Sequence, residues 1–176
     1  MTGPLHFEDL NVGDRWVSLG RTITETDIVN FAGMTGDFDP LHVDHEYAKQ
    51  TPFGKPIAHG LLGLSLVAGL ASQNPCIRTI AFLRIDGWEF HKPIYVGDTV
   101  YAETEVTAKE ARGNRSGKVT WRRRLVDAAG HVLQSGTFET LVAVARAARK
   151  PADPVQSAEA AAYPAASTPM ADRRIA

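Results

Sequence analysis

The sequence of 176 residues contains little cysteine, little net charge and no long apolar run. Its one cysteine, Cys76, rules out a disulfide within a single chain and fits a reducing compartment, so we expect a cytoplasmic protein. The net charge of −1 gives no electrostatic reason to expect nucleic acid as a partner. The longest apolar run, residues 61–71, is too short to span a bilayer. The N-terminus shows no basic segment followed by an apolar one, so we expect a soluble protein without a signal peptide.

A chain of this length suits one domain with a sizeable core. The last 28 residues hold nine alanines and four prolines but almost no large apolar side chains. Such a segment cannot bury enough apolar surface to offset the entropy lost on ordering. We therefore predict a folded domain over residues 1–148 and a flexible tail over residues 149–176.

The first half of the domain contains a capped helix followed by a loop. Thr24 fits an N-cap, with Asp27 three positions later and apolar residues at helical spacing beyond it. Gly36 closes this helix and begins the segment 36–42, Gly-Asp-Phe-Asp-Pro-Leu-His. We predict a loop here, since the proline keeps Asp39 out of the helical region.

Residues 59–72 form the most apolar segment and show no polar face, so we predict a helix buried on all sides. The second half of the chain alternates apolar and polar residues between turn signals, which indicates strands with one covered face. The predicted strands cover residues 15–22, 79–85, 88–90, 99–109, 118–126 and 131–145. This order predicts an α+β fold in which a curved antiparallel sheet wraps around one buried helix.

Asp37 and His42 are the strongest candidates for catalysis. A loop bent by Pro40 can aim a carboxylate and an imidazole at one small volume. Two such groups sharing a water molecule can remove one proton and deliver another, which is general acid–base chemistry. The alternative is an ordinary turn, because turns built from Gly, Asp and Pro are common.

Gly60 stands at the N-terminal end of the apolar helix, where backbone N–H groups lack intrahelical acceptors. These donors and the helix dipole can stabilise a developing oxyanion; the alternative is a glycine needed only for packing. His59 is interpreted as a structural histidine that bonds loop backbone. Ser65, inside the helix, could serve only to relieve crowding.

A metal site is not expected. Asp39, His42, Asp44 and His45 cluster in sequence, but adjacent ligands on a short loop rarely complete a site and no spaced partner set exists elsewhere. The run 122–124, Arg-Arg-Arg, would place alternate arginines on opposite faces of a strand. Exposed charges and a phosphate contact with a long substrate are the two interpretations of this run.

Three segments carry a resemblance to a known family. These are residues 35–42 (Thr-Gly-Asp-Phe-Asp-Pro-Leu-His), 56–62 (Pro-Ile-Ala-His-Gly-Leu-Leu) and the later pattern in 88–98. Over about residues 10–145 the chain resembles the MaoC-like dehydratases, which include the (R)-specific enoyl-CoA hydratases. The resemblance implies the hot-dog fold and a hydro-lyase that adds water across the 2,3 double bond of an enoyl thioester.

By the same resemblance, Asp37 and His42 match the catalytic pair, Gly60 matches the oxyanion position and Ser65 matches a serine near the site. We favour His42 as the group that takes the proton from water. The family works as homodimers or fused double domains, so we expect at least a homodimer with an acyl-CoA substrate. We expect no metal or redox cofactor, because the sequence shows no credible metal or dinucleotide motif.

One departure from the family pattern is visible. Asp39 replaces the usual asparagine, and an ionised aspartate only accepts hydrogen bonds whereas asparagine also donates them. Three alternatives to an enoyl-CoA hydratase stay open: a hot-dog acyl-CoA thioesterase, a non-catalytic acyl-thioester-binding subunit, and a dehydratase acting on an acyl-carrier protein. The loop with Asp37 and His42 disfavours the first two.

Overall fold

The computed structural model describes residues 3–145, and the tail predicted for 149–176 lies outside the described residues. The described segment contains short helices, one long helix and a set of strands. The helices are η1 (Phe7–Asp9), α1 (Glu25–Thr35), α2 (Pro40–Val43), α3 (His45–Lys49) and α4 (Gly60–Gln73). The strands are β1 (Arg15–Val17), β2 (Arg21–Thr22), β3 (Thr79–Phe90), β4 (Thr99–Arg112), β5 (Ser116–Asp127) and β6 (Val132–Ala143).

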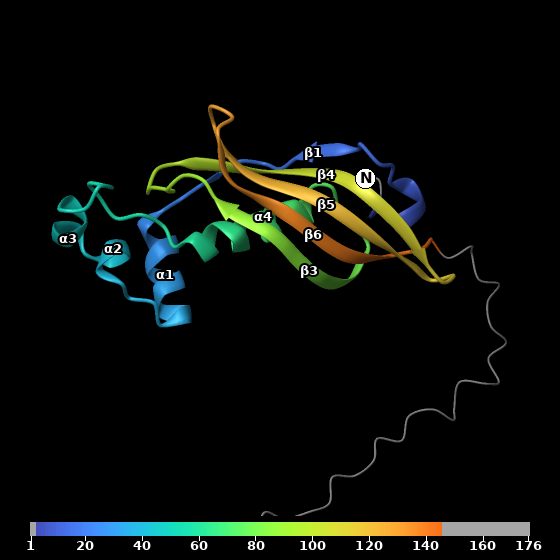
Figure 1. Cartoon of the computed structure of the whole chain (residues 1–176), viewed down its shortest axis with the longest axis horizontal. Helices are drawn as coiled ribbons and strands as arrows, with labels where there is room; N and C mark the ends of the chain where they lie inside the picture. The colour runs from blue at the N-terminus through green and yellow to red at the C-terminus, as the bar shows by residue number, and fades with distance from the viewer. Residues whose placement is uncertain (1–2, 146–176) are drawn as a thin grey trace, which may run out of the picture. The chain divides into compact units, whose positions relative to one another are not determined.

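Within residues 3–145 the strands form one six-stranded antiparallel sheet in the order β1-β4-β5-β6-β3, with β2 also pairing with β4. Two long hairpins join β4 to β5 and β5 to β6. The long helix α4 lies against one face of the sheet, whereas α1, α2 and α3 gather at one end of it (Figure 1). This arrangement confirms the predicted α+β fold.

Helix α1 begins and ends as its sequence predicts. The Thr24 side chain accepts a hydrogen bond from the backbone N–H of Asp27, and the Asp27 carboxylate accepts one from the N–H of Thr24. Burial alone raises the pKa of Asp27. The hydrogen bonds from Thr24 and the guanidinium of Arg21 together lower this pKa by more than burial raises it, so the pKa lies below its ordinary value. Gly36 ends the helix at φ 78°, a left-handed conformation that glycine adopts without strain.

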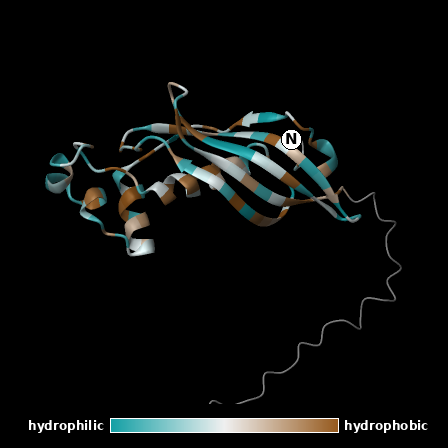
Figure 2. Cartoon of the chain, viewed as in Figure 1, coloured by the Kyte–Doolittle hydropathy of each residue, from teal (hydrophilic) through white to brown (hydrophobic). Residues whose placement is uncertain are grey.

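The core lies between α4 and the inner face of the sheet. Along β4 and β5, buried and partly exposed residues alternate with the period of two that a strand imposes. Bands of different hydropathy follow one another along the long strands in Figure 2. Trp121 and Phe138 are its largest fully buried side chains, and burying a side chain of this size stabilises the fold by about 1.5–3 kcal/mol. The indole N–H of Trp121 donates to Thr140 Oγ1 at 2.8 Å, so its polar atom is satisfied.

Several predicted boundaries differ from the structure. The strand predicted over residues 15–22 is two short strands, and those predicted over 79–85 and 88–90 are one strand, β3, with an irregular register between Asp86 and Glu89. The long helix is not buried on every side, because the described chain packs against only part of it and Leu61 stays 58% exposed. No helix within residues 3–145 is long and apolar enough to cross a membrane.

Candidate active site

Asp37 lies directly after Gly36, the C-cap of α1. Because Gly36 turns the chain away from the helix axis, the Asp37 carboxylate stands free of α1 and is 54% exposed. The backbone N–H of Asp39 donates to Asp37 Oδ1 at 3.3 Å. The loop thus fixes the carboxylate while leaving much of it open to solvent.

Asp39 stabilises this loop by capping the short helix that follows it. It is the N-cap of α2, and its Oδ1 accepts a hydrogen bond from the N–H of Leu41 at 2.8 Å. Pro40 occupies the first helical position, where its missing N–H costs nothing. The segment predicted as loop therefore contains a short helix, and this helix carries His42.

His42 lies on α2, and its ring is hydrogen-bonded to the segment before α4. Its Nδ1 is 2.7 Å from the backbone oxygen of Ile57. Because a carbonyl oxygen only accepts, Nδ1 carries the hydrogen, and in the neutral ring Nε2 then holds the free lone pair. This tautomer is the one that a proton acceptor needs.

His59 supports both groups from the start of α4, where it is the N-cap and only 3% exposed. Its Nε2 donates to the backbone oxygen of Asp37 at 2.9 Å and lies 3.9 Å from the Asp37 carboxylate. Its ring stacks on that of His42, with centroids 3.8 Å apart and planes 27° apart. Its buried Nδ1 has no hydrogen-bond partner among the described residues.

The structure thus brings Asp37, His42 and His59 together, with one possible ligand atom of each within 4.8 Å of the others. This triad could hold a metal ion, although two of its ring nitrogens already bond to carbonyl oxygens. Asp44 caps α3 and His45 contacts Glu25, so neither joins the triad. The prediction that the protein needs no metal stays a prediction.

Gly60 opens α4, where the N–H of Leu62 already donates to the carbonyl of His59 at 3.0 Å, so the N–H groups left without an intrahelical acceptor are those of Gly60 and Leu61. A Cβ at this position would lie 2.9 Å from the ring of Phe90, so only glycine lets that ring approach the helix start. The backbone oxygen of Gly60 accepts a hydrogen bond from Gln134 Nε2 at 3.0 Å. The N-terminus of α4 is therefore clamped from the sheet.

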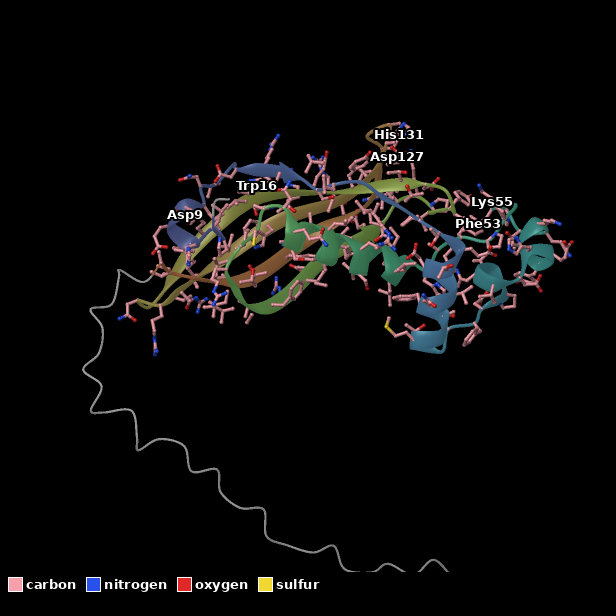
Figure 3. The ribbon with its side chains drawn as sticks, turned by 180° about the vertical axis from the view of Figure 1, so that it is seen from behind. Asp9, Trp16, Phe53, Lys55, Asp127 and His131 are labelled. Carbon is pink, nitrogen blue, oxygen red and sulfur yellow. The ribbon has the colours of Figure 1, made fainter. Side chains whose placement is uncertain are left out.

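A cavity of about 320 Å³ opens beside His42 and Gly60, whereas Asp37 and His59 do not line it. His42, Gly60 and Gln134 line it together with apolar side chains. The apolar walls include Phe53, Ile57, Phe90 and Ile94. Phe53 lies in the segment between α3 and α4, at the end of the molecule that carries the short helices (Figure 3). A mostly apolar cavity with a few convergent polar groups is typical of a small-molecule site.

Two further residues, Ser65 and Gln134, complete the description of the site. Ser65 is exposed and donates to the backbone oxygen of Leu61 at 2.8 Å, and it does not line the cavity. Gln134 was not predicted, although it is 2% exposed and accepts a hydrogen bond from the indole of Trp88 at 3.2 Å. A polar residue at an inward position of an otherwise apolar strand is the one signal that could have identified it.

The comparisons with known proteins agree with this geometry. The family model described as MaoC like domain matches residues 12–128. The (R)-specific enoyl-CoA hydratase of Aeromonas caviae is 38% identical over 101 residues, which are 57% of this chain and 74% of that protein. The solved structure of the (R)-hydratase of A. caviae matches with a TM-score of 0.65 at 34% identity. The match covers 76% of this chain and 97% of the A. caviae chain.

Two further relatives extend the comparison. The 3-hydroxybutyryl-CoA dehydratase of Methylorubrum extorquens is 37% identical over 103 residues, 58% of this chain and 64% of that protein. A Mycobacterium tuberculosis protein with a double hotdog fold has a TM-score of 0.69 at 23% identity, over 92% of this chain and 52% of that one.

The chain belongs to the MaoC-like domain family. Its fold is the hot-dog fold, with α4 as the central helix. Both conclusions confirm the resemblance found in the sequence.

Proposed function

We propose that the protein is a hydro-lyase that adds water across the 2,3 double bond of a trans-2-enoyl-CoA, and catalyses the reverse dehydration. The single observation that carries the proposal is that His42 clusters with Asp37 and, together with Gly60 at the N-terminus of α4, lines one mostly apolar cavity. The relatives that bear the names enoyl-CoA hydratase and dehydratase support the same reaction class.

The thioester carbonyl binds at the start of α4. As a nucleophile attacks C3, negative charge moves through the conjugated system to the carbonyl oxygen. Backbone N–H groups at Gly60, together with the helix dipole, stabilise that charge where it develops. Clamping by Gln134 keeps these donors in place before the reaction begins.

Proton transfer is divided between the two polar side chains. His42 Nε2 accepts a proton from water while the water oxygen bonds to C3, and Asp37 delivers a proton to C2. The imidazolium then returns its proton to the Asp37 carboxylate, so the enzyme is unchanged and one water molecule is consumed. Because both side chains lie in one cluster, we propose that the two additions occur on the same face of the alkene.

Coenzyme A as carrier, and the absence of any metal or redox cofactor, belong to the proposal. The test is to follow loss of the conjugated enoyl absorbance with crotonyl-CoA, with and without a chelator, while a thiol reagent monitors free coenzyme A. Hydration without thiol release supports the proposal. Thiol release without hydration indicates the thioesterase alternative, and activity lost in chelator and restored by one metal overturns the metal-free mechanism.

We also propose that two copies associate as a homodimer. β3 is the last strand in the sheet order, so its outer edge is unpaired among the described residues. Its large apolar side chains are exposed: Ile80, Phe82, Leu83 and Ile85. An exposed edge strand with such side chains typically marks an interface. Light scattering tests the proposal, and a monomer at micromolar concentration contradicts it.

The cytoplasmic location expected from the sequence also stays a prediction.

A further inference from the structure

The cavity beside α4 has a buried part and an exposed rim. Gln134, Ile94 and Ala58 line the buried part and are 2%, 2% and 6% exposed. His91 and Lys92, which directly follow β3, also line the cavity but are exposed to solvent. The rim therefore carries two side chains that can be cations.

The charge at this rim is positive and only partly used. Among the described residues that line the cavity, His42, His91 and Lys92 are the ionisable ones, and no carboxylate lines it. His91 is engaged, because its Nε2 lies 2.7 Å from Ser135 Oγ and 3.9 Å from a carboxylate oxygen of Glu89. The ammonium group of Lys92 makes no ion pair and no hydrogen bond within residues 3–145, so it is available to an anion.

The main chain holds Lys92 near the start of α4. The N–H groups of His91 and Lys92 both donate to the carbonyl of Leu133, at 2.8 and 3.2 Å. Leu133 directly precedes Gln134, whose amide binds the carbonyl of Gly60. The two contacts are one position apart on β6, so an arm that extends from Gly60 along the cavity passes Lys92.

The catalytic groups indicate which half of an enoyl thioester lies in the cavity. On the proposed mechanism, C2 and C3 lie at the cluster of Asp37 and His42, and Asp37 does not line the cavity. The acyl chain then extends on the Asp37 side, where Phe38 and Leu61 expose apolar side chains. With the thioester carbonyl at Gly60, the sulfur and the pantetheine arm attached to it enter the cavity.

The pantetheine arm and the cavity have matching chemistry. The arm contains methylene, methyl and amide groups, which suit walls that are mostly apolar. It ends in a phosphate ester both in coenzyme A and on an acyl-carrier protein. A lysine ammonium binds phosphate as a point charge, and Lys92 places such a charge where the arm leaves the cavity.

The arginines of residues 122–124, for which the sequence allowed a phosphate contact, lie elsewhere. Arg122 and Arg124 are on the outer face of the sheet and pair with Glu105 and Glu103 at 3.5 and 2.7 Å. Arg123 is on the inner face and only 7% exposed. None of these three arginines lines the cavity.

We propose that Lys92 binds the phosphate at the end of the substrate's phosphopantetheine arm. This inference rests on the proposed hydratase function and adds the part of the thioester carrier that the rim of the cavity recognises. Because Lys92 is remote from the reacting carbons, its contact is equally strong in the ground state and the transition state. Its loss therefore raises KM and leaves kcat nearly unchanged.

The experiment compares crotonyl thioesters of pantetheine, of 4′-phosphopantetheine and of coenzyme A, by loss of the enoyl absorbance. For the wild-type protein, kcat/KM should be about 5- to 20-fold higher with phosphopantetheine than with pantetheine, between the scales of an exposed ion pair and a charge-assisted hydrogen bond. Lys92→Met should remove this advantage through KM. The same variant should hydrate the pantetheine thioester at the wild-type rate.

Two variants serve as controls. Lys55 lies near Phe53 at the same end of the molecule (Figure 3), but its Nζ is 4.6 Å from the ring centroid of Tyr95 and it does not line the cavity. Lys55→Met should therefore keep the preference for phosphate. Lys92→Arg should keep most of it, because it retains the charge. The side chain of Lys92 is exposed, so neither substitution at this position should disturb folding.

The source of the phosphate is decided by adding a crotonyl thioester of an acyl-carrier protein. A higher kcat/KM for this substrate than for crotonyl-CoA assigns the phosphate to a carrier protein, and the reverse assigns it to coenzyme A; either result supports the inference if Lys92→Met reduces it. Equal wild-type values for pantetheine and phosphopantetheine overturn the inference and leave the function standing. The same holds if Lys92→Met lowers kcat/KM for all thioesters alike, or changes only the preferred acyl length. No hydration of any thioester overturns the function itself.

Discussion

Gln134→Leu is the substitution that tests the clamp on α4. The leucine keeps a branched side chain against Gly63, where a Cβ would lie 2.3 Å from Gln134 Nε2, but it removes both polar contacts. The indole N–H of Trp88 then loses its acceptor, and the carbonyl of Gly60 loses its donor on the sheet. A buried donor left unpaired costs about 1–3 kcal/mol and a lost net hydrogen bond about 1 kcal/mol, so unfolding should become easier by about 2–4 kcal/mol.

The same substitution should reduce catalysis through position alone. The N–H groups at Gly60 stay present but are less firmly held, and a displacement of about 1 Å can cost 10²-fold in rate. We expect kcat for crotonyl-CoA to fall about 10- to 100-fold, with a smaller change in KM. Denaturant unfolding followed by tryptophan fluorescence and initial rates from the enoyl absorbance measure the two effects separately.

Two variants separate the contributions of the two bonds. Gln134→Glu keeps an acceptor for Trp88 but directs a carboxylate at the Gly60 carbonyl, so it should lose at least as much activity as the leucine variant. Thr137→Val, on the opposite face of β6, should change neither stability nor rate by much. A leucine variant with lowered stability but unchanged kcat would refute the reasoning, because Gln134 would then support the fold without placing the thioester.

Four further predictions follow from the same geometry. Asp37→Asn and His42→Ala should each lower kcat about 10²-fold or more without unfolding the protein, as near-unchanged circular dichroism would show. Asp39→Asn keeps the cap oxygen of α2 and should retain most activity, whereas Asp39→Ala should lose about 1 kcal/mol of stability and part of the rate. A loss of activity in Asp39→Asn as large as that in Asp37→Asn would place Asp39 among the proton-transfer groups. The pKa of Asp27 is lowered in the folded state, so its carboxylate stabilises α1 fully above about pH 4 and loses this effect as the pH falls through that folded-state pKa. Asp27→Ala should therefore have a lower Tm than wild type at pH 7, and the two Tm values should converge in acid. Residues 1–150 alone should form an active dimer in light scattering and rate assays, and an inactive or monomeric product would assign the remaining segment a role.

Local signals explain what the sequence predicted well. The cap formed by Thr24 and Asp27 and the left-handed Gly36 depend on neighbours within a few residues, so the bounds of α1 follow from pattern alone. The helix α2 was missed although an aspartate cap followed by Pro40 is itself a start signal, because the proline was interpreted only as a turn.

Contacts between distant segments explain the rest. Gln134 bonds to Gly60, 74 positions earlier, and no short-range pattern reports such a contact. The buried position of Arg123 beside the ring of Phe138 is equally hidden from local patterns, because it depends on the register of β5 against β6. The exposed Leu61 shows a third limit, since a helix apolar on all sides needs more covering surface than the described chain supplies.

The hydrogen bonds of His42 and His59 have a joint consequence for how the site tolerates change. Each ring crosses to the other segment and bonds to a main-chain oxygen, His42 to that of Ile57 and His59 to that of Asp37. Every amino acid supplies a main-chain oxygen, so the side chains at the two acceptor positions can vary without loss of these hydrogen bonds. The connection is also reciprocal: removing either histidine removes a bond to the segment that carries the other. The catalytic side chains of this site are therefore positioned through the main chain of each other's segments.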